Sequence, residues 1–259
     1  FGCVSFDHVV HYDGYENYMI ALLKTAPCTR TIWAHSDMEK WMAEKHNPSR
    51  PLLQNAYASY DHVVPVGEDV KESAEHIGGH PEKVLVISNF MDYRRIQELG
   101  KLPVSFDSET ECTVSLNRLQ EILKSSDRKF INVGRFSPEK GHERLIRAFD
   151  RFWTDHPDTW LIIIGSHGEY YKHTCDLADS VRSSSHIILI KYMSNPFPVV
   201  KACDFFLLSS YYEGLGLVIL EADVFGVPTA SCDISGPHSF IRQYGGTLLP
   251  NSEDGLVQG

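Results

Sequence analysis

The stretch that decides the fold is Phe130-Ile131-Asn132-Val133-Gly134-Arg135, which is followed by an amphipathic segment over 139–153. Its first four residues form a short, mostly apolar run, which is typical of a strand buried on both faces of a parallel sheet. In the segment that follows, apolar residues recur at helical spacing. The order of strand and helix then repeats, with strands predicted at 161–164, 187–190, 205–208 and 229–232. The pattern predicts a doubly wound α/β domain over 128–259.

The first hundred residues repeat this alternation less regularly. Strands are predicted at 9–10, 31–34, 61–66 and 83–87, and a helix at about 16–24. We interpret 1–100 as the later part of a second Rossmann-like domain whose opening strands are missing, and the chain as a piece of a longer polypeptide. Residues 101–127, which contain Pro103 and a polar cluster at 107–111, are the predicted linker.

Composition excludes several classes of protein. The 259 residues carry 24 basic and 34 acidic side chains, and this net charge of −10 argues against sequence-independent nucleic-acid binding. No apolar run approaches the roughly 18 residues of a membrane span. The six cysteines form no CxxC pair, so we expect no metal site and a reduced, cytoplasmic setting. The sequence contains no GxGxxG, P-loop or GxSxG motif.

In open parallel sheets, ligands bind at the carboxyl ends of the strands. The stretch 134–141, Gly-Arg-Phe-Ser-Pro-Glu-Lys-Gly, follows the first strand and opens a helix. Gly134 permits a tight turn and the close approach of a ligand. Arg135, Lys140 and the free amides of a helix start together suit an anion. The alternative is that neighbouring glutamates neutralise Lys140 on a solvated face.

A second stretch, 209–221, reads Ser-Ser-Tyr-Tyr-Glu-Gly-Leu-Gly-Leu-Val-Ile-Leu-Glu. Gly214 and Gly216 would leave amides exposed at a helix start. Glu221 lies two turns into a segment that is apolar on nearly every side, where a carboxylate needs hydrogen-bond donors. A sugar diol supplies two such donors. The alternative is that Glu213 stabilises the helix dipole while Glu221 pairs with an arginine.

Three further features lie at predicted strand ends. His35 follows the strand at 31–34 and could donate a hydrogen bond into an interdomain cleft, although a lone histidine is more often structural. The stretch 11–15 could line the same cleft. The turn Gly165-Ser166-His167-Gly168 is small and polar, which suits the close approach of a nucleotide, but it could equally be only a turn.

Together these residues resemble the C-terminal domain of GT-B glycosyltransferases of family 4, the glycosyl transferases group 1. The resemblance rests on the stretches 134–141 and 209–221, on Gly165, and on Ala-Cys-Asp-Phe-Phe-Leu-Leu-Ser-Ser at 202–210. It extends to the strand ending at His35 and covers essentially the whole chain. The first half most resembles bacterial enzymes of cell-surface polysaccharide or teichoic-acid synthesis.

The resemblance implies two Rossmann-like domains that face a cleft, with the N-terminal one incomplete here. It implies a retaining, metal-independent hexosyltransferase that needs no cofactor and takes its sugar from a nucleotide diphosphate sugar, with a UDP-sugar expected first. The implied acceptor is a cell-surface glycan, a polyol, a teichoic acid or a lipid-linked glycan. The implied location is the cytoplasm, at the inner face of the membrane if segments outside this chain associate with lipid.

The resemblance also assigns roles to individual residues. Arg135 and Lys140 would bind the diphosphate and stabilise the leaving group, and Glu221 would hold the ribose hydroxyls. Glu213 and the amides after Gly214 would address the donor sugar and its phosphate, and His35 would be the cleft histidine near the sugar. The remaining implied binding residues are Gly134, Gly165, Leu215 and Gly216.

Two other functions stay open at this point. The chain could be a catalytically silent nucleotide-sugar-binding module of a larger protein. It could also be a GT-B epimerase, which would release free nucleotide without an acceptor and would require an additional pair of carboxylates. This chain alone could bind a nucleotide without transferring any sugar.

Overall fold

The computed structural model describes residues 5–45, 48–166, 168 and 170–258, which fall into two compact units. The smaller unit comprises Phe1–Phe90 with two short segments from later in the chain, Glu213–Leu215 and Ser235–Phe240. The larger unit comprises Met91–Tyr212, Gly216–Ile234 and Ile241–Gly259. None of the helices in the described ranges is long and apolar enough to cross a membrane.

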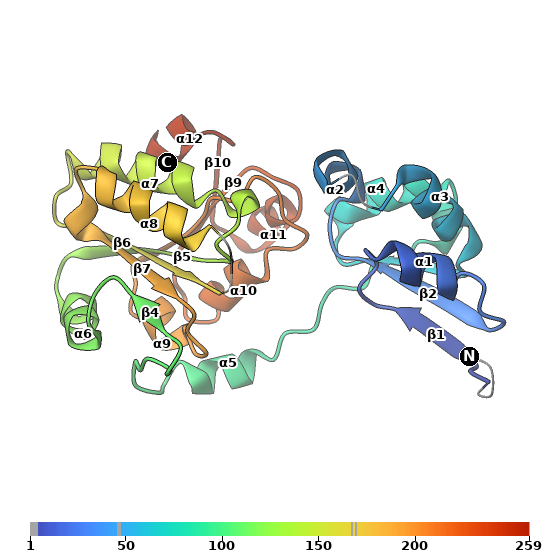
Figure 1. Ribbon diagram of the computed structural model, residues 1–259, viewed down its shortest axis with the longest axis horizontal. Helices are drawn as coiled ribbons and strands as arrows, with labels where there is room; N and C mark the ends of the chain where they lie inside the picture. The colour runs from blue at the N-terminus through green and yellow to red at the C-terminus, as the bar shows by residue number, and fades with distance from the viewer. Residues whose placement is uncertain (1–4, 46–47, 167, 169, 259) are drawn as a thin grey trace. The chain divides into compact units, whose positions relative to one another are not determined.

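The smaller unit is built on a parallel three-stranded sheet in the order β1-β2-β3. Its strands are β1 (His8–His11), β2 (Thr29–Ala34) and β3 (His62–Pro65), close to three of the predicted strands. Its helices are α1 (Asn17–Leu23), α2 (Met38–Lys45), α3 (Arg50–Ser59) and α4 (Glu68–Gly78) (Figure 1). The core between sheet and helices includes Ile20, Ile32, Leu53, Tyr57, Val63 and Val70.

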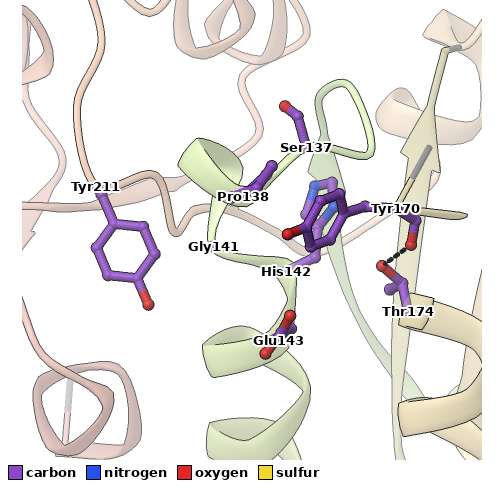
Figure 2. Close-up of a pocket in the computed structure, with 8 residues that line it drawn as sticks. All are labelled: Ser137, Pro138, Gly141, His142, Glu143, Tyr170, Thr174 and Tyr211. Atoms are coloured by element: carbon purple, nitrogen blue, oxygen red, sulfur yellow. Dashed lines mark hydrogen bonds between the residues drawn. The ribbon is translucent and has the colours of Figure 1, made fainter. Parts of the chain in front are cut away.

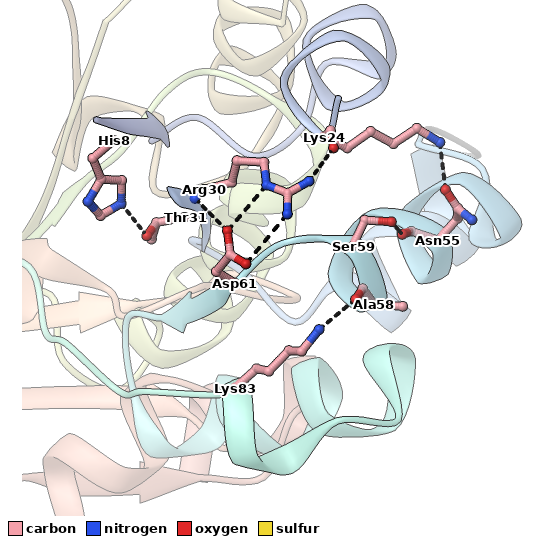
Figure 3. A network of polar contacts seen from close by, with 9 residues as sticks. All are labelled: His8, Lys24, Arg30, Thr31, Asn55, Ala58, Ser59, Asp61 and Lys83. Atoms are coloured by element: carbon pink, nitrogen blue, oxygen red, sulfur yellow. Dashed lines mark hydrogen bonds and ion pairs between the residues drawn. The ribbon is translucent and has the colours of Figure 1, made fainter. Parts of the chain in front are cut away.

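A polar network joins β2 to the residues just before β3 (Figure 3). The Arg30 backbone N–H and its Nε both donate to Asp61 Oδ2, at 2.8 and 3.2 Å, and the Arg30 Nη1 donates to the Lys24 carbonyl at 2.6 Å. Burial works to raise the pKa of Asp61, but the hydrogen bonds from Arg30 outweigh it and lower that pKa. The network therefore fixes the neighbouring ends of two parallel strands.

The predicted strand at 83–87 does not form. A 3₁₀ turn, η1 (Pro81–Lys83), is followed by a single bridge between Val84 and Val63. The Leu85 and Ile87 N–H groups still donate to the Val63 and Pro65 carbonyls, at 3.0 and 3.1 Å. Pro65 has no N–H to donate in return, which interrupts the ladder.

The larger unit confirms the predicted doubly wound domain. Its seven-stranded sheet has the order β10-β9-β8-β5-β6-β7-β4, and only the pairing of β4 with β7 is antiparallel. Numbered along the chain from β5, the six parallel strands follow the 3-2-1-4-5-6 order of dinucleotide-binding folds. The strands are β4 (Glu111–Cys112), β5 (Arg128–Val133), β6 (Thr159–Gly165), β7 (Ile187–Lys191), β8 (Phe205–Leu208), β9 (Thr229–Cys232) and β10 (Thr247–Leu249).

Helices cover both faces of this sheet (Figure 1). Helices α7 and α8 pack on one face, where Phe136, Leu145, Phe149 and Leu161 belong to a buried apolar cluster. The helices and 3₁₀ turns of this unit are α5 (Tyr93–Leu99), α6 (Leu116–Lys124), η2 (Pro138–Lys140), α7 (His142–Trp153), α8 (Tyr171–Ser180), η3 (Ser184–His186), α9 (Phe197–Lys201), α10 (Leu217–Asp223), α11 (Pro237–Tyr244) and α12 (Glu253–Gln258).

The segment predicted as a linker, 101–127, differs from that expectation, because it contains β4 and α6 and belongs to the larger unit. The Ser115 side chain caps α6 by accepting a hydrogen bond from the Arg118 N–H. Leu119 and Ile122, on one side of α6, are buried. The polar cluster at 107–111 is typical of a linker, but the apolar side of α6 packs the segment into the larger unit.

Candidate functional site

The turn between β5 and α7 carries the first predicted motif. The helix begins later than predicted: Pro138–Lys140 form a 3₁₀ turn, and Gly141, with φ of 64°, precedes α7. Lys140 therefore lies just before the helix and not inside its first turn. Gly141 is needed because a side chain there would collide with the Ser209 carbonyl.

Two glycines open the space beside this turn. Gly134 does not have the positive φ of a left-handed turn. Instead, the Lys140 stem packs over it, so that a Cβ at Gly134 would lie 3.4 Å from Lys140 Cδ. A Cβ at Gly165 would lie 2.4 Å from the Phe136 ring and 2.8 Å from the Gly134 carbonyl oxygen. Only glycine fits at Gly165 without displacing its neighbours.

A cavity of about 300 Å³ lies at the carboxyl ends of β5 and β6. Its lining residues come from four separate turns or helices. They include four predicted site residues, which are Gly134, Arg135, Lys140 and Gly165. Its position at the strand ends of a doubly wound sheet is where this fold binds ligands. The lining residues are Val133, Gly134, Arg135, Lys140, Ile164, Gly165, Ser166, Met193, Pro196 and Val218.

Glu221 lies on α10, one turn beyond Val218 and on the same side of the helix. Burial raises the pKa of its carboxyl group. None of the described residues donates a hydrogen bond to Glu221 or forms an ion pair with it. The alternative of a Glu221–arginine pair is therefore wrong for the part of the chain that the structure describes, and the carboxylate remains available to a ligand.

Two glutamates near Lys140 contact other basic side chains. The Arg135 Nη2 lies 3.4 Å from Glu139 Oε1, and the Arg135 side chain is 62% exposed. Glu143 contacts His173 Nε2 at 2.9 Å and the Arg147 guanidinium at 3.6 Å. Arg135 therefore reaches the cavity as a partly solvated cation that a phosphate could draw away from Glu139.

His35 follows β2 in the smaller unit, where it sits among aromatic rings. Its Nε2 lies 2.6 Å from the Tyr12 carbonyl oxygen, which can only accept, so Nε2 carries the proton and donates. The Trp33 ring stacks on His35 with centroids 5.8 Å apart. Only Nδ1 of His35 is left for a substrate. Neighbouring His11 is buried, and neither of its ring nitrogens has a partner among the described residues.

The predicted site residues are divided between the two units. Gly134, Arg135, Lys140, Gly165, Gly216 and Glu221 belong to the larger unit, while His35, Glu213, Gly214 and Leu215 belong to the smaller one. Gly216 precedes α10 with φ of 69°. His167, from the turn after β6, lies outside the described residues.

Sequence reasoning missed Met193, Pro196 and Val218, which line the cavity. Met193 and Pro196 come just after β7, so the strand-end rule that selected Gly134 and Gly165 could have found them. Val218 belongs to the segment 209–221, but its apolar side chain gave no sign of a ligand contact.

A second cavity, of about 170 Å³, lies against the first turn of α7 (Figure 2). Among the described residues, its lining includes Glu143 and the rings of Tyr170 and Tyr211, but no lysine or arginine. Burial lowers the pKa of His142, which also lines it, to about 3, so this imidazole is neutral at pH 7. The cavity thus offers a phosphate no positive charge. Within the described residues, no cluster of three or more His, Cys, Asp or Glu could hold a metal ion.

Comparison with solved structures supports the fold. The structure of HepE from Anabaena in complex with UDP and glucose superposes with a TM-score of 0.76 at 17% identity, covering 97% of this chain and 66% of that one. A UDP-forming trehalose-phosphate synthase from Burkholderia xenovorans gives a TM-score of 0.77 at 12% identity, covering 97% of this chain and 64% of that one. At these identities the likeness concerns the fold, which is GT-B.

Sequence relatives point to the same family. An uncharacterized glycosyltransferase of Methanocaldococcus jannaschii is 28% identical over 180 residues, which is 69% of this chain and 41% of the relative. The lipopolysaccharide core biosynthesis glycosyltransferase LpsE of Rhizobium meliloti is 27% identical over 192 residues, or 74% of this chain and 50% of LpsE. The chain thus spans about half the length of these relatives. Residues 116–258, more than half of the chain, match the model of Glycosyl transferases group 1, and the chain therefore belongs to that family.

Proposed function

We propose that this chain forms the donor-binding part of a retaining, metal-independent glycosyltransferase of family 4 that uses a UDP-sugar. The observation that carries this proposal is the cavity at the ends of β5 and β6. There Arg135 and Lys140 lie beside Gly134 and Gly165. Glu221, which has no partner in the part of the chain that the structure describes, lies one turn beyond the lining residue Val218. A nucleoside diphosphate supplies two phosphates for the cations and a ribose diol for the carboxylate.

The chemistry follows from where charge develops. In sugar transfer, the bond between the anomeric carbon and the donor's phosphate oxygen breaks, and its electron pair leaves with the phosphate. The acceptor's hydroxyl oxygen bonds to the anomeric carbon, and its proton passes to the departing phosphate oxygen. The positive charges of Arg135 and Lys140 favour the departing charge more than the intact donor, which lowers the barrier. In this proposal they supply the positive charge that a metal ion would otherwise provide.

The proposed roles of the smaller unit's residues concern the sugar. Glu213, Gly214 and Leu215 would address the donor sugar and its phosphate, and His35 would offer Nδ1, because its Nε2 is engaged by the Tyr12 carbonyl. We propose a cell-surface glycan or polyol as the acceptor and a cytoplasmic location. Two relatives support the acceptor class, since their names place them in lipopolysaccharide core and capsular polysaccharide biosynthesis.

Isothermal titration calorimetry with UDP, GDP, CDP and ADP tests donor binding directly. We expect UDP to bind with the highest affinity of the four. Tight binding of another nucleoside diphosphate would correct the base, and binding of none would refute the donor site. Turnover of a UDP-sugar only with a glycan or polyol acceptor would support transfer, whereas binding without turnover across a broad acceptor panel would indicate a silent binding module.

Glu221→Gln separates the ribose role from the phosphate role. The amide keeps the size of the side chain but loses the charge that strengthens hydrogen bonds from the ribose hydroxyls, so UDP affinity should fall by about 1–2 kcal/mol. Pyrophosphate has no ribose, and its affinity should stay within about twofold of wild type. Equal losses for both ligands would show that Glu221 acts on the pocket as a whole and not on the ribose.

A further inference from the structure

Arg144 is a buried cation with no role in the donor site described above. It is the third residue of α7, and only 4% of it is exposed. No carboxylate among the described residues forms an ion pair with it. Burying an unpaired charge is costly, and a cation in the first turn of a helix opposes the macrodipole. Neither an ion pair nor the helix dipole therefore accounts for an arginine at this position.

The guanidinium group is satisfied by neutral partners at the end of β8. Its Nε donates to the Ser209 carbonyl at 2.7 Å and its Nη2 to the Ser210 carbonyl at 2.6 Å. Its Nη1 donates to Asn251 Oδ1 at 2.8 Å, and the Tyr211 ring centre lies 3.9 Å from the guanidinium carbon. Because Ser209 and Ser210 are fully buried, their carbonyls need such donors.

The same two turns make further contacts with each other. Ser209 Oγ donates to the Lys140 carbonyl at 2.9 Å, and the Tyr211 N–H donates to the Glu139 carbonyl at 2.8 Å. Gly141 lies so close that a Cβ there would stand 2.8 Å from Arg144 Nε. The turn that presents Lys140 and the segment that leads from β8 toward α10 are therefore joined through Arg144 and Ser209.

We propose that Arg144 is a positioning residue of the donor site, an inference that rests on the proposed function. By holding the Ser209 and Ser210 carbonyls, it fixes the turn that carries Lys140 relative to the segment that leads to α10 and Glu221. The geometry of the guanidinium fork matters here, not only its charge. A lysine would keep the charge, but its ammonium group cannot reproduce the planar fork that meets both carbonyls and Asn251.

The test compares Arg144→Lys and Arg144→Gln with Arg147→Lys and Arg147→Gln in the same chain. Arg147 lies on the same helix, is 51% exposed and pairs with Glu143, so it provides a matched surface control. UDP affinity is measured by calorimetry well below the unfolding midpoint, which is determined separately for each variant. We expect both Arg144 variants to bind UDP about tenfold or more weakly, and both Arg147 variants to match wild type.

The outcomes are separable. A wild type that binds none of the four nucleoside diphosphates overturns the proposed function, and the positioning role with it. A wild type that binds UDP, with folded Arg144 variants that bind equally well despite a lower unfolding midpoint, overturns the positioning role alone. If the Arg144 variants do not fold, Ser209→Ala replaces them, because it removes only the hydroxyl that holds the Lys140 carbonyl. Ser209→Ala should weaken UDP binding several-fold, and unchanged affinity would overturn the inference.

Discussion

The cavity at the ends of β5 and β6 and an apolar cavity between the sheet, α7 and α12 are similar in size, about 300 and 240 Å³. The first is lined by two glycines, two cations and a serine together with five apolar residues. The second is lined mainly by apolar side chains, among them Phe130, Phe149, Leu207 and Leu256. Volume alone therefore does not identify the donor site in this unit.

The difference comes from where each cavity lies on the sheet. At the strand ends the backbone leaves the sheet, so N–H groups and charged side chains meet there without partners from the ladder. Over the face of the sheet most backbone groups are already paired, and mainly side chains remain to fill the space. We therefore expect phosphate binding at the cavity at the strand ends. The apolar cavity should affect only packing and stability.

Lys140→Ala should give the largest contrast. Removing the ammonium group should weaken UDP binding by about 1–3 kcal/mol, or roughly 5- to 150-fold, the range for hydrogen bonds to charged groups. Calorimetry at fixed ionic strength measures the loss. Lys172→Ala, an exposed lysine on α8, is the control and should bind like wild type. If both variants lose affinity equally, general charge and not the cavity attracts the nucleotide.

His142→Asn should change how stability depends on pH. The pKa of His142 is about 3 in the folded protein, below the ordinary value of 6.5, because the ring is buried next to Lys140. The unfolded chain therefore binds one more proton between these values. The free energy of unfolding should fall as the pH drops from 6.5 toward 3, by at most about 1.4 kcal/mol per pH unit from this residue.

Urea unfolding of wild type and His142→Asn at several pH values measures this slope. The variant should lose part of the wild-type slope between pH 6.5 and 4, whatever its stability at pH 7. His156→Asn alters an exposed histidine of the same unit and should keep the slope. Identical slopes for wild type and His142→Asn would mean that His142 is not held neutral.

Ala148→Leu should give the smallest effect and should act only on the apolar cavity. Ala148 lies on α7, is 2% exposed and lines that cavity. The added carbons would bury apolar surface, so we expect about 1 kcal/mol of extra stability after losses to strain. UDP affinity should stay within about twofold of wild type. A clear change in affinity would show that the two cavities are coupled through α7.

Several strands of this fold could be predicted from short stretches of sequence. The apolar runs at 130–133, 161–164 and 187–190 predicted three central strands, because strands buried on both faces need continuous apolar sequence. The start of α7 was placed too early, since η2 and the left-handed Gly141 depend on the nearby Ser209 carbonyl. The predicted strand at 83–87 does not form because its neighbour β3 ends in Pro65, which has no N–H to donate.

The sequence by itself determined the order of strands and helices and the strand ends where a ligand would bind, because these depend on periodicities carried within short segments. The tertiary structure alone decided that Glu221 has no partner among the described residues, that Arg135 pairs with Glu139, and that Arg144 holds two carbonyls. The physical reason is distance along the chain. Arg144 and Ser209 are 65 residues apart, and only the packing of α7 against the end of β8 brings such a donor and acceptor together.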